Sequence, residues 1–495
     1  MSFKQAIGST SPARRIAANV VDCLRAGTDL SKSRLSYPCC ICEPRRSSVN
    51  QLMSGLISTI SATLRAMRRK LRPPSSEALR PPEPSLRTLG SQPPTLLLLN
   101  DCSDQINYGA EALMEGLLRI IAAAIPNHTL RMIPSHWLIE PEFFSREFHN
   151  GSSLVQPAAI WPHVADQFEC IADEWLAGRG GRGVDVYLKA LQDVDLVILN
   201  GEGSMYRTNL SAVRELFVAW FAKTKLGIPT VFLNGLIHLT LVVPILPAMM
   251  KKTFRVLDAV AVRDPYSLRN VHDFMSEIPV TLIPDSALAV PVEIDNPSPG
   301  VMALFRQLGN TDFFCFDPGP MPIDHRFGPR SALYRLITEI KQLIPQAVMV
   351  ASGPSEAPML KQLAADTDSI YLDHQPSYRD LMAVLARTKF QISGRNHNPL
   401  LGALVGCPVI SIGSTSHKVH GMCEILEVSE PYDGTDLRSN IDRIKTHVAS
   451  HLVNGVMVRN QIKSIAARLA VESFEMGVIV KNVLAKQSKH EVRTQ

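Results

Sequence analysis

Residues 391–424 read QISGRNHNPLLGALVGCPVISIGSTSHKVHGMCE, and this stretch decides the fold class. The apolar run 388–392 predicts a buried strand, and residues 393–398 predict a polar turn. Residues 400–405 then predict a helix, and residues 408–412 predict a second strand. A strand, a helix and a parallel strand make a βαβ unit, which is the building block of an open α/β sheet.

The turn of this unit is the first candidate site. In an open α/β sheet, the loop at the carboxyl end of a strand faces the ligand, and the N-terminus of the next helix attracts anions. Arg395, Asn396 and His397 lie in this loop, and Lys418 follows the second strand. A lone His usually has a structural role, but the nearby Arg395 favours phosphate binding or acid–base chemistry for His397. The sequence therefore predicts an anion site here.

The composition is typical of a large α/β protein. The chain has 495 residues, 45% of them hydrophobic and 20% charged, which is enough for two domains. Its nine cysteines have no regular spacing, which predicts free thiols and a cytoplasmic location. No uninterrupted apolar run reaches the length of a membrane span. Cys39 and Cys42 have no second Cys or His pair at a suitable spacing, so we expect no metal site.

Residues 1–90 are predicted to form a basic extension outside the core. They hold 15 of the 51 Lys and Arg residues but only 5 of the 46 Asp and Glu residues, a net charge of +10. The other residues carry 36 basic and 41 acidic side chains, and this balance argues against a nucleic-acid partner. The Pro- and Ser-rich residues 72–94 predict an extended linker, and we expect most of the extension to be disordered.

An amphipathic helix is predicted near residues 51–71, where apolar side chains recur every three or four residues before a basic end. Such a helix fits peripheral contact with the inner face of an anionic membrane. Docking on the body of the protein or on another subunit is an equal alternative. A wrongly assigned start codon or an organelle transit peptide would also explain the segment.

Strands alternate with helices from Thr95 onward, and this alternation predicts parallel sheets. In residues 91–290 the predicted strands are 96–99, 129–133, 195–199, 230–233, 259–262 and 280–283. In residues 301–455 they are 313–316, 347–351 and 370–372, followed by the opening unit. We therefore expect two Rossmann-like, doubly wound domains that face a cleft. In the C-terminal region, 456–495, we expect a helix that packs back on the first domain and a disordered tail.

Polar residues follow several strands of the first predicted sheet. Asn200, Gly201 and Glu202 come directly after the strand 195–199. Glycines at this place let the backbone approach a ligand, and Glu202 would place a carboxylate over the carboxyl edge of the sheet. A plain glycine turn is the alternative.

Further candidates follow other strands of this sheet. Asp104 and Asn107 lie after the first strand, where they would position substrate hydroxyls or cap the next helix. Arg263 would hold a carboxylate or phosphate by two parallel hydrogen bonds, and Asp264 would cap a helix or orient that guanidinium. A surface ion pair is the alternative for these two. Asp285 is another carboxylate at a strand end, with capping as its alternative.

In their order along the chain, these motifs resemble those of the polysaccharide pyruvyl transferase family. They cover residues 96–426 and are DLVILNGEGS (195–204), VRDPYS (262–267), PDSAL (284–288), SGRNH (393–397) and GCPVISI (406–412), followed by Lys418. The resemblance implies a fold like that of the two-domain B-type glycosyltransferases (GT-B). It also implies a transferase of polysaccharide or exopolysaccharide biosynthesis with phosphoenolpyruvate as donor, no other cofactor, and a glycan or lipid-linked saccharide as acceptor.

The resemblance also implies roles for single residues. The family's Arg-x-His motif falls on Arg395 and His397, and Asn396 lies where the family often has an apolar residue. The family's Arg-Asp pair begins at Arg263, and its late lysine falls on Lys418. The implied donor-binding residues are Arg263, Arg395, Asn396, His397 and Lys418.

Formation of a pyruvate ketal needs cations for the donor, an acid for the enol carbon and a base for the sugar hydroxyl. We expect His397 to be the acid and Glu202 or Asp104 to be the base, although Glu202 departs from the family's usual glycines. The expected acceptor-binding residues are Asn107, Asn200, Gly201, Glu202 and Asp285.

An insertion, residues 134–184, is expected to select the acceptor, because exposed aromatic side chains suit stacking on sugars. Its aromatic residues include Trp137, Phe143, Phe144, Trp161 and Trp175. The sequence GRGGRG at 178–183 matches G-x-G-x-x-G, but it does not follow a strand, so it predicts a basic loop and not a dinucleotide site.

Two other functions fit the same architecture, because a fold does not determine a reaction. One is a glycosyltransferase with a nucleotide-sugar donor. No acidic residue lies eight positions after Glu424, Glu427 or Glu430, so the acidic pair common in retaining enzymes of that class is not found. The other is a non-catalytic glycan-binding protein, against which the retained Arg395 and His397 argue.

Overall fold

The computed structural model describes residues 92–103, 107–134, 161–181, 184–203, 205, 210–239, 245–319, 331–353, 356–372, 377–413 and 417–494. By its contacts the chain divides into two units, Met1–Glu77 and Ala78–Gln495. The helix expected at 51–71, the candidate Asp104 and most of the insertion lie outside the described residues. None of the helices in the described part of the chain is long and apolar enough to cross a membrane.

The first sheet of the unit Ala78–Gln495 has six parallel strands in the order β2-β1-β3-β4-β5-β6. The strands are β1 (Thr95–Asp101), β2 (Thr129–Pro134), β3 (Leu196–Asn200), β4 (Thr230–Gly235), β5 (Ala259–Val262) and β6 (Thr281–Leu282). β1, β3 and β4 are buried along their whole length, as expected for strands covered on both faces. The chain reverses its direction of travel across the sheet between β1 and β3, which is where α/β sheets usually bind ligands.

The second sheet has five parallel strands in the order β11-β10-β7-β8-β9. The strands are β7 (Phe313–Asp317), β8 (Gln346–Met349), β9 (Ile370–Tyr371), β10 (Gln391–Ser393) and β11 (Val409–Ser411). Here the reversal falls between β7 and β10, whose last residues, Asp317 and Ser393, are paired in register. These two sheets with interleaved helices confirm the predicted α/β class with two Rossmann-like domains.

Helices cover the outer face of each sheet. The helices packed on the first sheet include α6 (Phe168–Leu176), α7 (Val184–Leu191), α8 (Leu210–Lys225), α9 (Ile245–Phe254) and α10 (Pro265–Phe274). The second sheet packs against α12 (Ala332–Lys341), α13 (Ala357–Asp366) and α17 (Leu437–Val453). Their buried aliphatic and aromatic side chains form two separate cores.

A third core joins the inner faces of both sheets. It contains Leu98 and Ile198 from the first sheet and Cys315 and Val348 from the second, all buried and part of one cluster. The helices in this layer include α3 (Tyr108–Ala124), α11 (Pro299–Leu308), α14 (Tyr378–Arg387), α15 (His397–Leu404) and α16 (Lys418–Ile425), with the short 3-10 helix η2 (Ser286–Ala289). The two sheets therefore meet through a continuous hydrophobic core.

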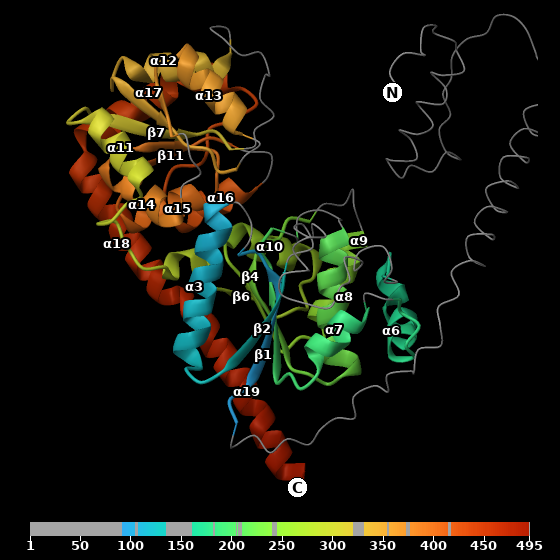
Figure 1. Ribbon diagram of the computed structural model, residues 1–495. Coiled ribbons are helices and arrows are strands. Elements are labelled where there is room, and N and C mark those ends of the chain that lie inside the picture. The colour runs from blue at the N-terminus through green and yellow to red at the C-terminus, as the bar shows by residue number, and fades with distance from the viewer. Residues whose placement is uncertain are drawn as a thin grey trace, which may run out of the picture. The chain divides into compact units, whose positions relative to one another are not determined.

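Two helices, α18 (Gly455–Ser473) and α19 (Glu475–Thr494), follow α17, where the sequence predicted one helix and a disordered tail. α18 contacts α15 and η2, and α19 contacts α3 of the first domain (Figure 1). Gly477 lets α19 come close to α3, because an added Cβ would lie 2.9 Å from the Cβ of Ala124.

Two expectations from the sequence are wrong. Trp161 and Trp175 were expected to be exposed for sugar stacking, but they are only 7% and 0% exposed. Their rings pack edge to face at 5.1 Å against each other, in an aromatic cluster that lies against α8, because burial of large rings stabilises the insertion. The turn predicted at 393–398 is shorter than expected, since α15 begins at His397.

Candidate active site

A buried ion cluster lies at the carboxyl edge of the first sheet. Arg263 follows β5 directly, Glu202 lies in the loop after β3, and Asp285 precedes η2. The Arg263 guanidinium forms ion pairs with both carboxylates, and its Nη1 atom lies 2.7 Å from Asp285 Oδ2. Its side chain is only 2% exposed, so this is a buried ion cluster and not the surface ion pair considered as an alternative.

The charges in this cluster keep both carboxylates ionised. Burial alone would raise the pKa of Glu202, but Arg263, Lys418 and His397 together lower it below its usual value. Burial would also raise the pKa of Asp285, but Arg263 and the neighbouring His397 imidazole lower it well below its usual range. Both groups are therefore charged at neutral pH.

Several residues predicted to belong to the site have a structural role at this edge of the sheet. Asn107 caps α3 by accepting a hydrogen bond from the Gly109 backbone at 2.9 Å, and Asp264 caps α10 in the same way through Ser267. Asn200 has no exposed surface, and its amide donates to the Asn100 carbonyl at 3.1 Å. In this structure Asn200 therefore has no surface from which to reach a substrate.

Gly201, predicted to bind the acceptor, is a point of close packing. An added Cβ there would lie 2.4 Å from the Phe232 ring and 2.7 Å from the Gly235 backbone. Glycine is therefore needed where β3 and β4 end side by side.

The second sheet contributes a basic pair at its own carboxyl edge. Arg395 follows β10, and its guanidinium forms an ion pair with Glu356 and lies 3.9 Å from Asp317. His397 is the first residue of α15, and its side chain is 10% exposed. Asn396 directly precedes this helix, is partly exposed and makes no side-chain capping bond.

The ion cluster of the first sheet and the basic pair of the second sheet meet at Asp285 and His397. His397 Nε2 lies 3.5 Å from Asp285 Oδ2, so one carboxylate contacts the cation of its own sheet and the imidazole of the other domain. Gly109, in the first turn of α3, makes room for the ring, because an added Cβ would lie 2.3 Å from His397 Nδ1. Lys418, the first residue of α16, is partly exposed and acts electrostatically on the same cluster.

A second connection between the domains was not predicted. The Tyr108 hydroxyl, at the start of α3, has one proton for two acceptors. Asp317 Oδ2 lies 3.0 Å and Asn398 Oδ1 lies 2.6 Å from its oxygen, which also contacts Ser352. Asn398 in turn donates to Asp317 at 2.9 Å. Asp317 could have been predicted from the sequence, since it is a polar residue at the end of a strand. Tyr108 could not, because its hydrogen-bonding partners lie far away in the sequence.

Polar atoms without hydrogen bonds are concentrated at this meeting point. Among the described residues, Arg263 Nη2, His397 Nε2 and Arg395 Nε are buried and make no hydrogen bond. Buried polar groups in proteins normally have partners, so such atoms indicate a place for a ligand. Nitrogen donors from two domains beside ionised carboxylates can hold an anion and move a proton.

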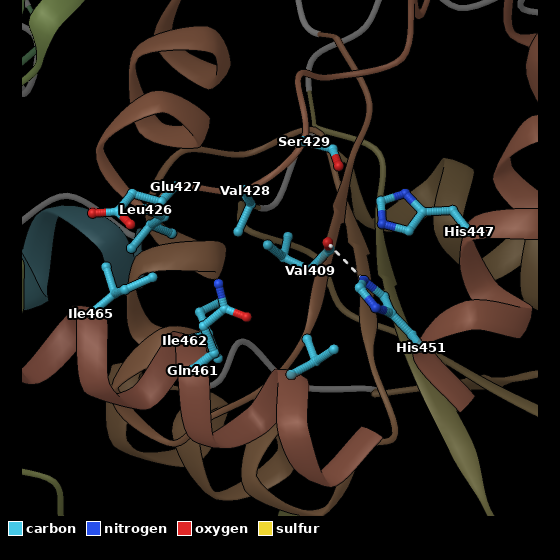
Figure 2. Close-up of a pocket in the computed structure, with 11 residues that line it drawn as sticks. Val409, Leu426, Glu427, Val428, Ser429, His447, His451, Gln461, Ile462 and Ile465 are labelled. Atoms are coloured by element: carbon cyan, nitrogen blue, oxygen red, sulfur yellow. Dashed lines mark hydrogen bonds between the residues drawn. The ribbon is translucent and has the colours of Figure 1, made fainter. Parts of the chain in front are cut away.

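A separate cavity of about 170 Å³ lies between β11, α17 and α18. Figure 2 shows His447 and His451 of α17 beside Val409, whose carbonyl accepts a hydrogen bond from His451 at 3.4 Å. Val409 is the first residue of β11, so this cavity lies at the opposite end of the strand from the ion cluster. Most of its lining is aliphatic, and none of the described residues that line it is an Arg or Lys that would bind an anion.

The fold and site define an α/β enzyme with two Rossmann-like domains. A scan against protein families matches residues 107–417 to the family described as polysaccharide pyruvyl transferase. The match covers more than half of the chain and includes both the ion cluster and the basic pair, with Lys418 one residue beyond it. The chain therefore belongs to the polysaccharide pyruvyl transferase family and is a transferase of polysaccharide biosynthesis.

Solved structures give weaker likenesses. A putative UDP-N-acetylglucosamine 2-epimerase from Listeria monocytogenes is 12% identical, with 81% of this chain and 98% of that chain covered and a TM-score of 0.48. UGT71G1 of Medicago truncatula, complexed with UDP-glucose, is 11% identical, with 79% and 98% covered and a TM-score of 0.47. No curated protein sequence matches the chain. The two parallel sheets themselves define the fold class.

Proposed function

We propose that this enzyme transfers the enolpyruvyl group of phosphoenolpyruvate to a sugar hydroxyl, closes it to a pyruvate ketal and releases phosphate. The acceptor is a sugar of a polysaccharide or of its lipid-linked precursor, and the reaction needs no further cofactor. The observation that carries the proposal is the meeting of Arg263 and His397 on Asp285, with Arg395 on the facing sheet edge.

Three cations hold the donor in this proposal. Phosphoenolpyruvate carries a carboxylate and a phosphate on a three-carbon skeleton, so it needs positive charge on more than one side. Arg263 approaches from the first sheet, Arg395 from the second, and Lys418 from α16. Guanidinium groups suit both donor groups, because they form two parallel hydrogen bonds to planar oxygen pairs.

A proton transfer to the donor starts the reaction. His397 gives a proton to C3 of the enol, and the sugar hydroxyl oxygen forms a bond to C2 as its own proton leaves. Glu202 accepts that proton, since it is ionised and lies in the cluster. The bond from C2 to the phosphate oxygen then breaks, and phosphate leaves with the electron pair. The second sugar hydroxyl oxygen forms a bond to C2, its proton passes to His397, which has given up its own, and the proton held by Glu202 leaves with the phosphate.

Asp285 orients the reacting groups. Its carboxylate contacts both Arg263 and His397, so it holds the imidazole beside the donor-binding cation.

The roles expected for Asp104 and the acceptor-binding role of Asn107 stay proposals. Contact with a membrane through residues 51–71, and a cytoplasmic location, also stay proposals.

The test is direct. Purified protein is incubated with phosphoenolpyruvate and a panel of glycans, with phosphate release and product mass as readouts. We expect a product heavier than the acceptor by pyruvate minus water. His397→Ala and Arg395→Ala should each lower phosphate release by about 100-fold or more. Wild-type rates in both variants would show that the site is assigned wrongly.

A binding measurement separates this proposal from the nucleotide-sugar alternative. Isothermal titration with phosphoenolpyruvate should give a saturable signal, whereas a nucleoside diphosphate should give none. Binding of the nucleoside diphosphate alone, together with sugar transfer from its sugar conjugate, would replace the proposed function.

A further inference from the structure

Three rings are packed together beside the ion cluster. His417, the residue before α16, stacks on His238 with ring centroids 4.5 Å apart and an angle of 13° between the planes. It also stacks on Tyr266 of α10 at 4.7 Å and 26°. His238 lies in the loop after β4, so the cluster joins residues of both domains. Stacking on two sides fixes the orientation of the His417 ring.

His417 is buried without a hydrogen-bonding partner. The residue is 5% exposed, and neither ring nitrogen makes a hydrogen bond to a described residue. A buried imidazole normally uses at least one nitrogen in a hydrogen bond, because burial removes its water. A fixed ring with two unused nitrogens therefore points to a ligand as the missing partner.

The surroundings keep this ring neutral. Burial lowers the pKa of His417 to about 2, and His238, Lys418, Arg263 and His420 act in the same direction. These groups come from the loop after β4, from the end of β5 and from α16. A neutral imidazole carries one N–H group, so it can still donate a hydrogen bond to an anion.

The position of His417 links it to the donor site. His417 directly precedes Lys418, and its stacking partner Tyr266 lies in the first turn of α10, three residues after Arg263. The same two cations act electrostatically on the carboxylate of Glu202. His417 therefore borders the cations that we assign to the donor, on the side of α16. No local pattern predicts this role for His417, because its stacking partners are about 150 and 180 residues away in the chain.

We propose that His417 is an additional donor-binding residue, a neutral imidazole whose N–H group donates a hydrogen bond to an anionic oxygen of phosphoenolpyruvate. The inference rests on the proposed function, since it takes the same donor. His238 and Tyr266 are positioning residues that hold the ring. The acceptor oxygen belongs to either the carboxylate or the phosphate, and both present the same chemistry to the imidazole.

Titration calorimetry of the full chain tests this proposal with three probes: phosphoenolpyruvate, inorganic phosphate and pyruvate. His417→Ala should weaken phosphoenolpyruvate binding by about 10-fold to 100-fold, as expected for a lost hydrogen bond to a charged group. His417→Gln should restore much of the affinity, because its amide also donates. His420→Gln, an exposed residue on the same helix, is the matched control and should bind as wild type.

The other probes show which group is held. A selective loss of phosphate binding in His417→Ala assigns the phosphate, and a selective loss of pyruvate binding assigns the carboxylate. The ratio of variant to wild-type affinity should stay constant between about pH 6 and pH 8, because a neutral ring does not titrate there.

Three results would overturn the proposal, and they are distinguishable. Unchanged affinity of His417→Ala for all three probes, with normal binding by wild type, removes His417 from the site and leaves the proposed function intact. Failure of wild type to bind phosphoenolpyruvate removes the proposed function and this inference together. If His417→Gln binds as weakly as His417→Ala and both melt at a lower temperature, the role is structural and the proposal is wrong.

Discussion

His397 Nε2 lies 3.5 Å from Asp285 Oδ2, although the two residues follow strands of different sheets. A carboxylate already paired with Arg263 therefore also holds the imidazole of the other domain. The shared hydrophobic core keeps the sheets in this position, because separating them would expose its aliphatic side chains to water. The ion cluster and the basic pair consequently act as one site.

Asp285→Asn should lower the rate of phosphate release by about 100-fold, because the amide keeps the shape but removes the charge that holds Arg263 and His397. Steady-state kinetics with phosphoenolpyruvate and a glycan acceptor measure this. Asp312→Asn is the control, since Asp312 is exposed and pairs only at the surface with Lys389. Equal rates in the two variants would rule out a role for Asp285.

Gly109→Ala should disturb the position of His397, because the added Cβ would lie 2.3 Å from its Nδ1 atom. We expect a loss of turnover of about 10-fold or more, since small displacements of a catalytic group are costly. Gly455→Ala is matched to it, because an added Cβ there meets nothing within 4 Å at the start of α18. Full activity of Gly109→Ala would show that the His397 ring has room to move without loss.

Tyr108→Phe should lower the free energy of unfolding by about 1–3 kcal/mol, because buried Asp317 and Asn398 lose a hydrogen-bonding partner. Urea unfolding followed by circular dichroism measures this. Tyr334→Phe, a partly buried tyrosine on α12, should change stability by less than about 0.5 kcal/mol. Equal effects at both positions would contradict a special role for the Tyr108 hydroxyl.

Stability should fall as the pH decreases from about 6.5 to 4, in part because of His447. Burial, and after it His451, lower the pKa of His447 to about 4 in the folded protein. In the unfolded chain a histidine titrates near about 6.5, so below that pH the unfolded state binds more protons and is favoured. Above about pH 6.5 both states are neutral and the effect vanishes.

The measurement is urea unfolding of wild type and His447→Gln across this pH range. The difference in the free energy of unfolding between wild type and His447→Gln isolates the contribution of His447 from that of carboxylates that titrate in the same pH range. His272→Gln, an exposed histidine on α10, serves as control and should follow wild type. Parallel curves for wild type and His447→Gln would refute the prediction.

The sequence alone determined the fold class and the order of the strands along the chain. Buried parallel strands are short apolar runs between polar turns, so local composition was sufficient to find them. It also located Glu202, Arg263, Asp285, Arg395 and His397, because polar residues directly after a strand lie at the carboxyl edge of a parallel sheet.

Only the tertiary structure decided which of these residues meet. The contact between Asp285 and His397 spans more than a hundred residues of chain, and it depends on how the inner faces of two sheets pack. The same packing buries Trp161 and Trp175 and brings Tyr108 to Asp317. The spacing of apolar residues along the sequence predicts which face of a helix or strand is apolar, but it does not predict which distant element covers that face.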